Sequence, residues 1–481
     1  MLLFSYYKID DDGEMFMLKV YNTATHCKEE FKPIREKEVR FYGCGPTIYN
    51  YAHIGNMRAF VFYDLLNRYL RYKGYQVTFC MNLTDVDDKT IRDSQKEGKK
   101  LRDFTDFYGA EFFKDCATLN IRKPDIVPRA TEEIPAMLEL IQNLIDKGYA
   151  YQTEKGDVYF KINRFSEYGQ MAGIDASALK LNADGRLSSD EYEKENAQDF
   201  ALWKAWEERD GDNYWDSPFG KGRPGWHIEC SAMSKKYLGQ PFDIHTGGID
   251  LVFPHHTNEI AQSECAYCSK YVNYWMHNEH ITVNGKKMSK SLGNCFTLNE
   301  LIEKGYSAEA IRYEFIKAHY RQRMDFQEAS LPGNQTVIDK FGNFLNRLRN
   351  EANGLGWGDL PVVIEKALKG FEKGMDDDLN VPVALASVFD FMTEVNKHFS
   401  ELSSDNAKSI VSVMDQFDSV LAVFPKEKEQ TLTPEQQDLI DRRQTARLAK
   451  DWATADALKQ ELIAQGIEVK DTPQGPVWRF I

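Results

Sequence analysis

Two short stretches of this sequence carry residues that are suited to phosphate chemistry. The first, residues 42–56, reads YGCGPTIYNYAHIGN and holds three glycines and His53. Glycines lack the Cβ atoms that would keep a ligand from the backbone, and a helix that begins beyond His53 would offer free N–H groups to a phosphate. The second, residues 287–291, reads KMSKS. Its two lysines and two hydroxyls supply charge and hydrogen bonds for a polyphosphate.

The segments around these stretches predict how they are held. Residues 38–42 are typical of a short strand, apolar residues then recur at helical spacing as far as Gly74, and a second strand is expected at residues 77–83. This is a βαβ unit, in which ligands bind at the carboxyl end of the strands. The lysine-rich stretch follows a predicted hairpin, residues 281–283 turning at Asn284-Gly285. We therefore expect an α/β nucleotide-binding fold with a parallel sheet.

A second kind of chemistry is suggested by sulfur, imidazole and carboxylate side chains. His255 and Glu259 are four residues apart, so they would share one face of a helix. With Cys44 and Cys230 they would make a donor set that zinc accepts. Their spacing alone leaves other interpretations open, because both cysteines would also fit a core and His255 would also fit a helix start. Cys265-x-x-Cys268 is a rival metal pair, which we interpret as packing.

The two phosphate-type stretches, in this order and separation, resemble the two signature sequences of class I aminoacyl-tRNA synthetases. The first signature usually ends in a second histidine, and Asn56 takes that place here. An amide still forms hydrogen bonds to phosphate or ring atoms, but it carries no charge. The resemblance implies a Rossmann-like catalytic domain that binds ATP with Mg²⁺.

Three further segments, residues 43–46, 225–230 and 253–259, are similar to those of cysteinyl-tRNA synthetases. In that family the corresponding residues hold one zinc ion per chain, which implies the ligands Cys44, Cys230, His255 and Glu259. The implied reaction activates L-cysteine with ATP and transfers it to the 3′ end of tRNA(Cys). Zinc suits this task because shape alone in an apolar pocket separates cysteine from serine only about 10–200-fold.

The resemblance also implies a role for other residues, although packing or helix capping explains Thr84 and Trp226 about equally well. The implied catalytic residues are His53, Asn56, Lys287 and Lys290. The implied ATP contacts are Gly45, His53, Gly55, Asn56, Gly248, Asp250, Lys287, Ser289 and Lys290. The implied cysteine contacts are Thr84, Trp226 and His256. The implied anticodon contacts are Arg447, Trp452, Asp456 and Asp471, near the end of a segment whose charges would otherwise be surface charge.

Changes in composition and in the spacing of apolar residues divide the chain into seven parts. We expect a bundle of helices late in the chain, because apolar residues there recur at helical spacing, and a small module with two helices and a strand pair at its end. The expected parts are an N-terminal extension (1–16), the first catalytic half (17–121), a connective insertion (122–201), the second catalytic half (202–296), a helical junction (297–334), the helical bundle (335–424) and the anticodon-binding domain (425–481).

Composition narrows the class of protein. The chain has 481 residues and a net charge of −14, which argues against a general nucleic-acid coat but leaves room for a local basic face. No apolar run approaches the roughly 20 residues of a membrane span, and the acidic N-terminus fits no targeting peptide. We expect a cytoplasmic protein whose eight cysteines are free thiols or metal ligands. The resemblance implies a monomer.

Two rival functions remain open from the sequence. A ligase that joins cysteine to an amino sugar would share the catalytic half, but such relatives lack the terminal module. A non-catalytic RNA-binding paralogue is the other rival. The intact lysine stretch and the full metal set argue against it, whereas Asn56 favours it slightly.

Overall fold

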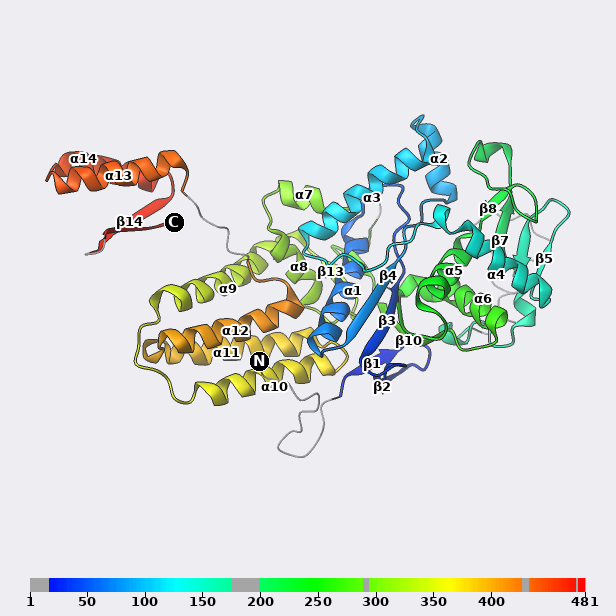
Figure 1. Cartoon of the computed structure of the whole chain (residues 1–481), viewed down its shortest axis with the longest axis horizontal. Coiled ribbons are helices and arrows are strands. Elements are labelled where there is room, and N and C mark those ends of the chain that lie inside the picture. Colours follow the sequence, from blue (N-terminus) through cyan, green and yellow to red (C-terminus); the bar gives the residue numbers. More distant parts are fainter. Residues whose placement is uncertain (1–16, 175–198, 289–293, 426–431, 473–474, 481) are drawn as a thin grey trace. The chain divides into compact units, whose positions relative to one another are not determined.

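The computed structural model describes residues 17–174, 199–288, 294–425, 432–472 and 475–480. The chain divides into two compact units, Met1–Phe424 and Pro425–Ile481, and each is described by itself (Figure 1). None of the helices in the described parts combines the length and the apolar character that a membrane crossing requires.

The larger unit is built around a parallel sheet of four strands. Their order is β10 (Val272–Asn278), β9 (Phe242–Gly248), β3 (Glu38–Gly43) and β4 (Gln76–Met81). Successive strand residues point to opposite faces, so Phe41 joins the core that contains helix α1 (Ile54–Tyr72), and Tyr42 joins the core that contains α5 (Trp226–Leu238). The sheet is covered on both faces, and the predicted βαβ unit is confirmed.

Helix α1 begins and ends where the sequence predicts, and its start is set by two side chains. His53 Nδ1 accepts a hydrogen bond from the backbone N–H of Asn56 (3.2 Å), while Asn56 Oδ1 accepts one from the N–H of His53 (3.2 Å). Such reciprocal capping satisfies two N–H groups that the helix leaves open. At the other end Gly74 adopts a positive φ of 85°, which turns the chain into β4.

A second, antiparallel sheet lies between the two halves of the parallel sheet in the sequence. Its strands are β5 (Ala150–Gln152), β6 (Val158–Phe160), β7 (Phe200–Ala205) and β8 (Gly222–Pro224), and β5 and β6 form a hairpin. Strand β7 crosses residue 201, where we expected the insertion to end. Strands β7 and β8 pair within this sheet, so the sheet continues past that residue. The helices before it are α2 (Asp88–Lys96), α3 (Leu101–Thr118) and α4 (Ile134–Asp146).

After the parallel sheet, the chain forms a separate sheet of three short strands together with two helices. β11 (Ile281–Val283) and β12 (Lys286–Lys287) form the predicted hairpin, and β11 also pairs in parallel with β13 (Met324–Phe326). Helices α7 (Leu298–Glu303) and α8 (Ala308–Ile316) lie between β12 and β13 in the sequence. A short hairpin near the N-terminus, β1 (Lys19–Asn22) with β2 (Cys27–Glu30), completes the strands of this unit.

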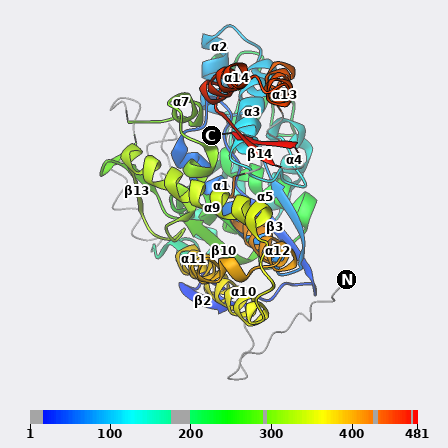
Figure 2. The same cartoon turned by 90° about the vertical axis from the view of Figure 1, so that its left-hand side faces the viewer.

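Four helices form the predicted bundle in the last part of the larger unit. They are α9 (Leu331–Glu351), α10 (Leu360–Asp376), α11 (Val381–Lys397) and α12 (Ser404–Leu421), and Figure 2 shows α10, α11 and α12 side by side. The apolar stripe that predicted the bundle is buried, with Phe341 and Leu348 at most 1% exposed. This stripe is therefore core.

The smaller unit has the two helices and the strand pair that the sequence predicts. Helices α13 (Pro434–Leu448) and α14 (Trp452–Ala464) pack on each other, and β14 (Ile467–Thr472) pairs with β15 (Gly475–Phe480) in antiparallel fashion. Its small core contains Leu439, Leu458 and Leu462.

Candidate active site

Four side chains with metal-binding donors meet in the larger unit at the carboxyl edge of the parallel sheet. Cys44 directly follows β3, and Cys230 lies in the first half of α5. His255 precedes α6 (Thr257–Tyr267), and Glu259 lies in its first turn. One strand end and the starts of two helices bring them together, so residues separated by up to 215 positions in the sequence converge.

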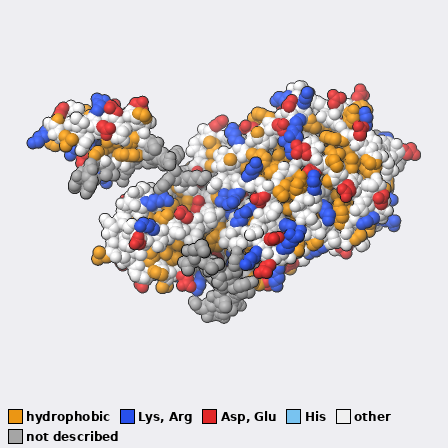
Figure 3. All heavy atoms as spheres, in the orientation of Figure 1, with side chains coloured by type: hydrophobic (Ala, Val, Ile, Leu, Met, Phe, Trp, Pro, Cys, Tyr) orange, Lys and Arg blue, Asp and Glu red, His pale blue; other side chains and the backbone are white. Residues whose placement is uncertain are grey.

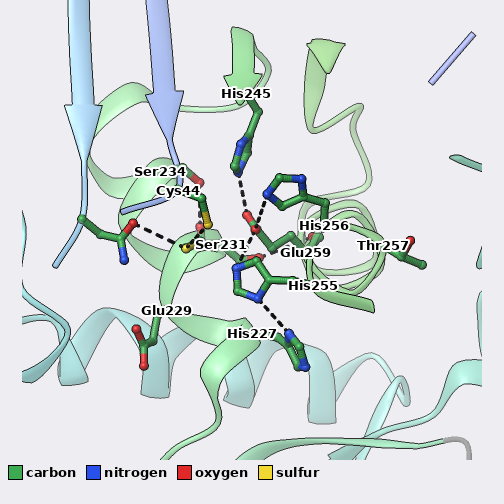
Figure 4. Close-up of polar contacts among 12 residues, drawn as sticks. Cys44, His227, Glu229, Ser231, Ser234, His245, His255, His256, Thr257 and Glu259 are labelled. Atoms are coloured by element: carbon green, nitrogen blue, oxygen red, sulfur yellow. Dashed lines mark hydrogen bonds and ion pairs between the residues drawn. The ribbon is translucent and has the colours of Figure 1, made fainter. Parts of the chain in front are cut away.

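The donor atoms of these four residues all lie within 4.8 Å of one another, and all four side chains are buried. Figure 4 shows Cys44, His255 and Glu259 on the sides of one common centre. The two sulfur atoms are 3.6 Å apart, and His255 Nε2 lies 3.1 Å from Glu259 Oε1. The structure thus places together all four residues that the sequence named as metal ligands.

The donor set fits a metal ion such as zinc. Two thiols, an imidazole and a carboxylate are the ligand types that zinc takes in proteins. His255 Nε2 and Glu259 Oε1 are buried and, close as they are, lack a well-aligned hydrogen-bond partner in the described structure. Buried polar atoms are normally paired. Two such atoms aimed at two thiols indicate a ligand that all four share.

The surroundings of the cluster set opposing pKa shifts. Burial raises the pKa of the Cys230 thiol well above its usual value. Burial alone would also raise the pKa of Glu259, but His245 and His255 outweigh it and lower that pKa to about 2. The Glu259 carboxylate is therefore charged in a buried site, where a cation is strongly favoured.

Three residues around Glu259 fix its orientation. His245 Nε2 and the Tyr271 hydroxyl each lie 2.9 Å from Glu259 Oε2, and the Tyr271 hydroxyl is 2.7 Å from Ser234 Oγ. Oε2 is thus occupied, which leaves Oε1 facing His255 (Figure 4). A carboxylate held in this way presents one oxygen to the cluster.

A second group of three, His245, His256 and Glu259, also lies within 4.8 Å. It contains no sulfur, its His245 and Glu259 pair with each other, and its His256 Nε2 is a buried atom with no hydrogen-bond partner among the described residues. His245 Nε2 is paired with Glu259, and His256 Nδ1 is 2.7 Å from His277 Nε2. The set with two cysteines is therefore the better metal site.

Thr84 and Glu229 form a buried pair beside the cluster. The Thr84 hydroxyl donates to Glu229 Oε2 (2.7 Å) and accepts from the Asn82 amide (3.1 Å). Burial raises the pKa of Glu229 well above its usual value, and its Oε1 atom is among the buried atoms with no hydrogen-bond partner. The polar residues Asn82 and Thr84 thus follow the end of β4, and Thr84 contacts a protein carboxylate here.

The other two predicted cysteine contacts differ in position. The Trp226 ring lies over the His255 ring, with centroids 4.2 Å apart. It therefore adjoins the metal-type cluster. His256 is fully buried next to His277, and Gly247 makes room for it, since a Cβ there would lie 2.4 Å from the His256 ring.

The residues predicted to bind ATP border the same edge of the sheet. A Cβ at position 45 would lie 1.6 Å from the carbonyl oxygen of Asn82, so only glycine lets the two strand ends approach there. A Cβ at position 55 would lie 2.3 Å from the Met288 side chain. The first signature therefore touches the beginning of the second.

A backbone contact also ties the first signature to the segment after the lysine stretch. The N–H of Ile54 donates to the carbonyl of Phe296 (2.9 Å), just beyond the lysine stretch. Gly248 ends β9, and Asp250 follows it on the surface. The Lys287 side chain, Ser289 and Lys290 lie outside the described residues.

The predicted anticodon residues lie together on the smaller unit. Arg447 Nη1 is 3.1 Å from Asp471 Oδ2, and its guanidinium lies 5.6 Å from the centroid of the Trp452 ring. Trp452 is 55% exposed, and Asp456 is exposed on the same helix, α14. Arg443, a residue outside the predicted set, binds both Asp471 oxygens at 2.9 Å.

Sequence reasoning missed the residues that support the cluster. Asn82 accepts from the N–H of Gly45 (2.8 Å), and His227 Nδ1 lies 2.9 Å from His255 Nδ1. Glu229 and His227 both stand in the segment that supplied Cys230. Their position in the sequence next to a proposed ligand could have indicated a supporting role. Their hydrogen-bond partners, however, are known only from the fold.

Comparison with protein families accounts for most of the chain. The family model of the class I (C) tRNA synthetase catalytic domain matches residues 30–336, the DALR domain model matches residues 370–425, and the model of the cysteinyl-tRNA ligase anticodon binding domain matches residues 429–479.

Comparison with individual proteins agrees. The chain is 46% identical over 471 residues to the cysteine--tRNA ligase of Brachyspira hyodysenteriae, covering 95% of this chain and 98% of that protein. It is 43% identical over 462 residues to the cysteine--tRNA ligase of Protochlamydia amoebophila, covering 95% and 97%. The solved Mycobacterium tuberculosis methionyl-tRNA synthetase in complex with methionyl-adenylate resembles it in fold, with a TM-score of 0.58 at 15% identity over 80% of this chain and 88% of that one.

Proposed function

This chain belongs to the cysteine--tRNA ligase family of class I aminoacyl-tRNA synthetases, and on that premise we propose which of its residues perform each part of the reaction. ATP converts L-cysteine into cysteinyl-adenylate and diphosphate, and the terminal adenosine of tRNA(Cys) then takes the cysteinyl group and releases AMP. The observation that carries the residue assignment is the buried cluster of Cys44, Cys230, His255 and Glu259 beside the turn that leads to His53.

We propose that these four residues hold one zinc ion. Zinc in such a site binds a thiolate far better than a hydroxyl, which would favour cysteine over serine. The chain's own part is to orient the ligands: His245 and Tyr271 fix the Glu259 carboxylate, and Trp226 stacks on His255.

The rest of the amino acid would be bound by polar groups beside the cluster. Glu229 Oε1 is buried and has no hydrogen-bond partner in the part of the chain that the structure describes, and its other oxygen accepts a hydrogen bond from the Thr84 hydroxyl. We propose that this pair faces the ammonium group of cysteine. Positioning of this kind directs the cysteine carboxylate toward the α-phosphorus of ATP.

ATP would bind along the edge formed by the two signatures. We propose that His53 and the first N–H groups of α1 contact the phosphates, and that Asn56 acts mainly by capping the helix and holding His53. Asp250 would accept from the ribose hydroxyls, next to Gly248. Lys287, Ser289 and Lys290, with Mg²⁺, would stabilise the charge that develops on the leaving diphosphate.

The smaller unit would bind the anticodon of the tRNA. An exposed tryptophan with an arginine beside it suits stacking on an unpaired base, and exposed carboxylates suit base edges. The match to an anticodon-binding model favours tRNA over an amino sugar as the acceptor. One chain carries every residue used here, so we propose a monomer, working in the cytoplasm where its substrates meet.

The test is ATP–pyrophosphate exchange followed by tRNA charging. We expect exchange with cysteine, a preference over serine well above the roughly 10–200-fold that shape alone provides, and charging of tRNA(Cys). Equal exchange with serine would contradict the proposed zinc-based selection. Exchange without charging would contradict the proposed acceptor.

A further inference from the structure

Two exposed aromatic side chains, Tyr51 of the first signature and Phe107 of α3, meet at a third that is half-buried, Tyr108. Tyr51 is 41% exposed and Phe107 is 45% exposed, although both are large apolar residues. The Tyr51 ring lies 6.2 Å from that of Phe107 and 5.5 Å from that of Tyr108, between centroids. We call these three residues the aromatic platform. Single exposed apolar residues are common, but a contiguous exposed group indicates a binding surface.

The platform lies at the rim of the active site, and its position is fixed. Tyr51 stands in the loop that joins Cys44 to His53, and two residues span at most about 7 Å, so its backbone is that close to His53. The loop is tied to the sheet by backbone hydrogen bonds, with Ile48 N–H donating to Thr84 (3.1 Å) and Ile54 N–H donating to Phe296 (2.9 Å). The rings are therefore held in place before any ligand arrives.

Positive charge accompanies the rings. Lys99 Nζ lies 5.6 Å from the Phe107 ring centroid, and the turn from α2 to α3, residues 96–100, exposes three lysines and one glutamate. Figure 3 shows apolar and basic side chains next to each other over this part of the molecule. Lys99 Nζ also pairs with Glu97 Oε2 (2.8 Å), so residues 96–100 together carry a net charge of +2 in a chain whose net charge is −14. Exposed rings beside cations are the chemistry that binds single-stranded nucleic acid.

We propose that the aromatic platform stacks the unpaired 3′-terminal nucleotides of the tRNA as they enter the active site. The inference rests on the proposed function, because the acceptor of the cysteinyl group is the last nucleotide of that strand. This end must cross the rim to reach the adenylate, and the platform lies where the loop between Cys44 and His53 meets α3. Stacking on rings tolerates any base, which suits an end that must move.

The experiment measures tRNA charging and tRNA binding with the full-length enzyme. The variants are Tyr51→Leu, Phe107→Leu and the double variant, which keep apolar volume but remove the ring faces. We expect the double variant to raise the KM for tRNA and its Kd by about 10-fold, within the roughly 5- to 150-fold range of base–aromatic stacking. Exchange of ATP and pyrophosphate by the Phe107→Leu enzyme, which involves no tRNA, should stay within about twofold of wild type.

The second arm uses tRNA that lacks its terminal cytidine and adenosine. Wild type and double variant should bind this shortened tRNA equally well, because the nucleotides that stack are gone. Tyr51→Phe, which keeps the ring, should behave as wild type. Leu355→Ala serves as a matched control for loss of an exposed apolar side chain, since Leu355 is fully exposed in the loop between α9 and α10.

The outcomes separate this inference from the proposed function. If the wild-type enzyme charges tRNA and the double variant has the same KM and Kd, the platform is overturned and the proposed function stands. A defect that is equally large with shortened tRNA also overturns it, because the rings would then act elsewhere. If wild type charges no tRNA, the proposed function fails and this inference fails with it.

Discussion

The two regions assigned to recognition, the metal-type cluster and the surface of the smaller unit, are built in opposite ways. In the cluster, Cys230 and Glu259 are at most 1% exposed, and their neighbours orient them through short hydrogen bonds. On the smaller unit, Trp452 is 55% exposed and Arg447 pairs with Asp471 at the surface. The cluster is a buried, preorganised site of a size that suits a small ligand, whereas the smaller unit offers an exposed surface that suits a large ligand.

Because of this difference, geometry alone supports the assignment of the cluster more strongly than that of the smaller unit. Buried donors that lack partners are costly, so they point to a ligand directly. Exposed charged groups form weak pairs with each other and need the family match to suggest a partner. Changes in the buried cluster should therefore have larger effects than changes on the exposed surface of the smaller unit.

The largest effect is expected for Cys230→Ser. Removal of one thiolate ligand should lower zinc content and cysteine affinity together, by roughly 100-fold or more, above the 10–100-fold typical of outer partners. Zinc per chain and the KM for cysteine in exchange are the measurements. Cys265→Ala is the control, because Cys265 is a buried cysteine outside the cluster. Normal zinc content in Cys230→Ser would remove Cys230 from the ligand set.

Removal of the smaller unit should separate the two reactions. A chain that ends at Phe424 keeps the whole cluster and both signatures. We expect exchange within about twofold of the full chain, but charging of tRNA reduced by about 100-fold or more through loss of a second contact point. A parallel loss of both activities would argue against independent regions.

A smaller effect is expected from Tyr271→Phe. This change removes one of the hydrogen bonds that hold Glu259 Oε2 but leaves all four donors in place. We expect zinc affinity to fall by roughly 10-fold, measured by competition with a chelator. Tyr274→Phe is the matched control, since Tyr274 lies in β10, just after Tyr271 in the chain, and its hydroxyl donates to the carbonyl oxygen of Glu30 instead. Equal affinities in the two variants would contradict the supporting role.

The smallest effect is expected at Asp471 on the smaller unit. Hydrogen bonds from Arg443 hold the pKa of Asp471 below its usual value. A lowered carboxyl pKa adds stability that is present above the unfolded pKa, near 3.9, and is lost as the pH falls through the folded pKa. Because Asp471 is partly exposed, Asp471→Asn should cost less than about 1 kcal/mol at pH 7. Urea unfolding at pH 7 and pH 3 measures this difference, which should shrink at pH 3.

Sequence patterns were sufficient for elements whose residues are neighbours in the chain. The strand, helix and strand from Glu38 to Met81 follow from apolar spacing, and the stop at Gly74 follows from glycine's freedom. The pairing of His255 with Glu259 follows from a separation of four. The four metal-type ligands were named through the family resemblance, and the fold then brought them together.

Other features depend on contacts that no local pattern encodes. Tyr271 reaches Glu259 only because the chain returns from α6 to the sheet as β10, and Glu229 meets Thr84 across 145 positions. The Asn56 side chain provides a cap for α1, and the expected contact of Asn56 with a phosphate stays a prediction. The antiparallel sheet of β5 to β8 continues past residue 201, because β7 pairs with β8, which follows a loop of the chain. No pattern within β7 itself indicates this pairing.

The most direct test of the central claim is X-ray absorption at the zinc edge, on the full chain with and without L-cysteine. Our assignment predicts one zinc per chain with two sulfur neighbours at about 2.3 Å and two nitrogen or oxygen neighbours at about 2.0–2.2 Å. Added cysteine should raise the sulfur count to three, and added serine should leave it at two. Zinc with only nitrogen and oxygen neighbours, or a sulfur count that cysteine does not change, would contradict the assignment.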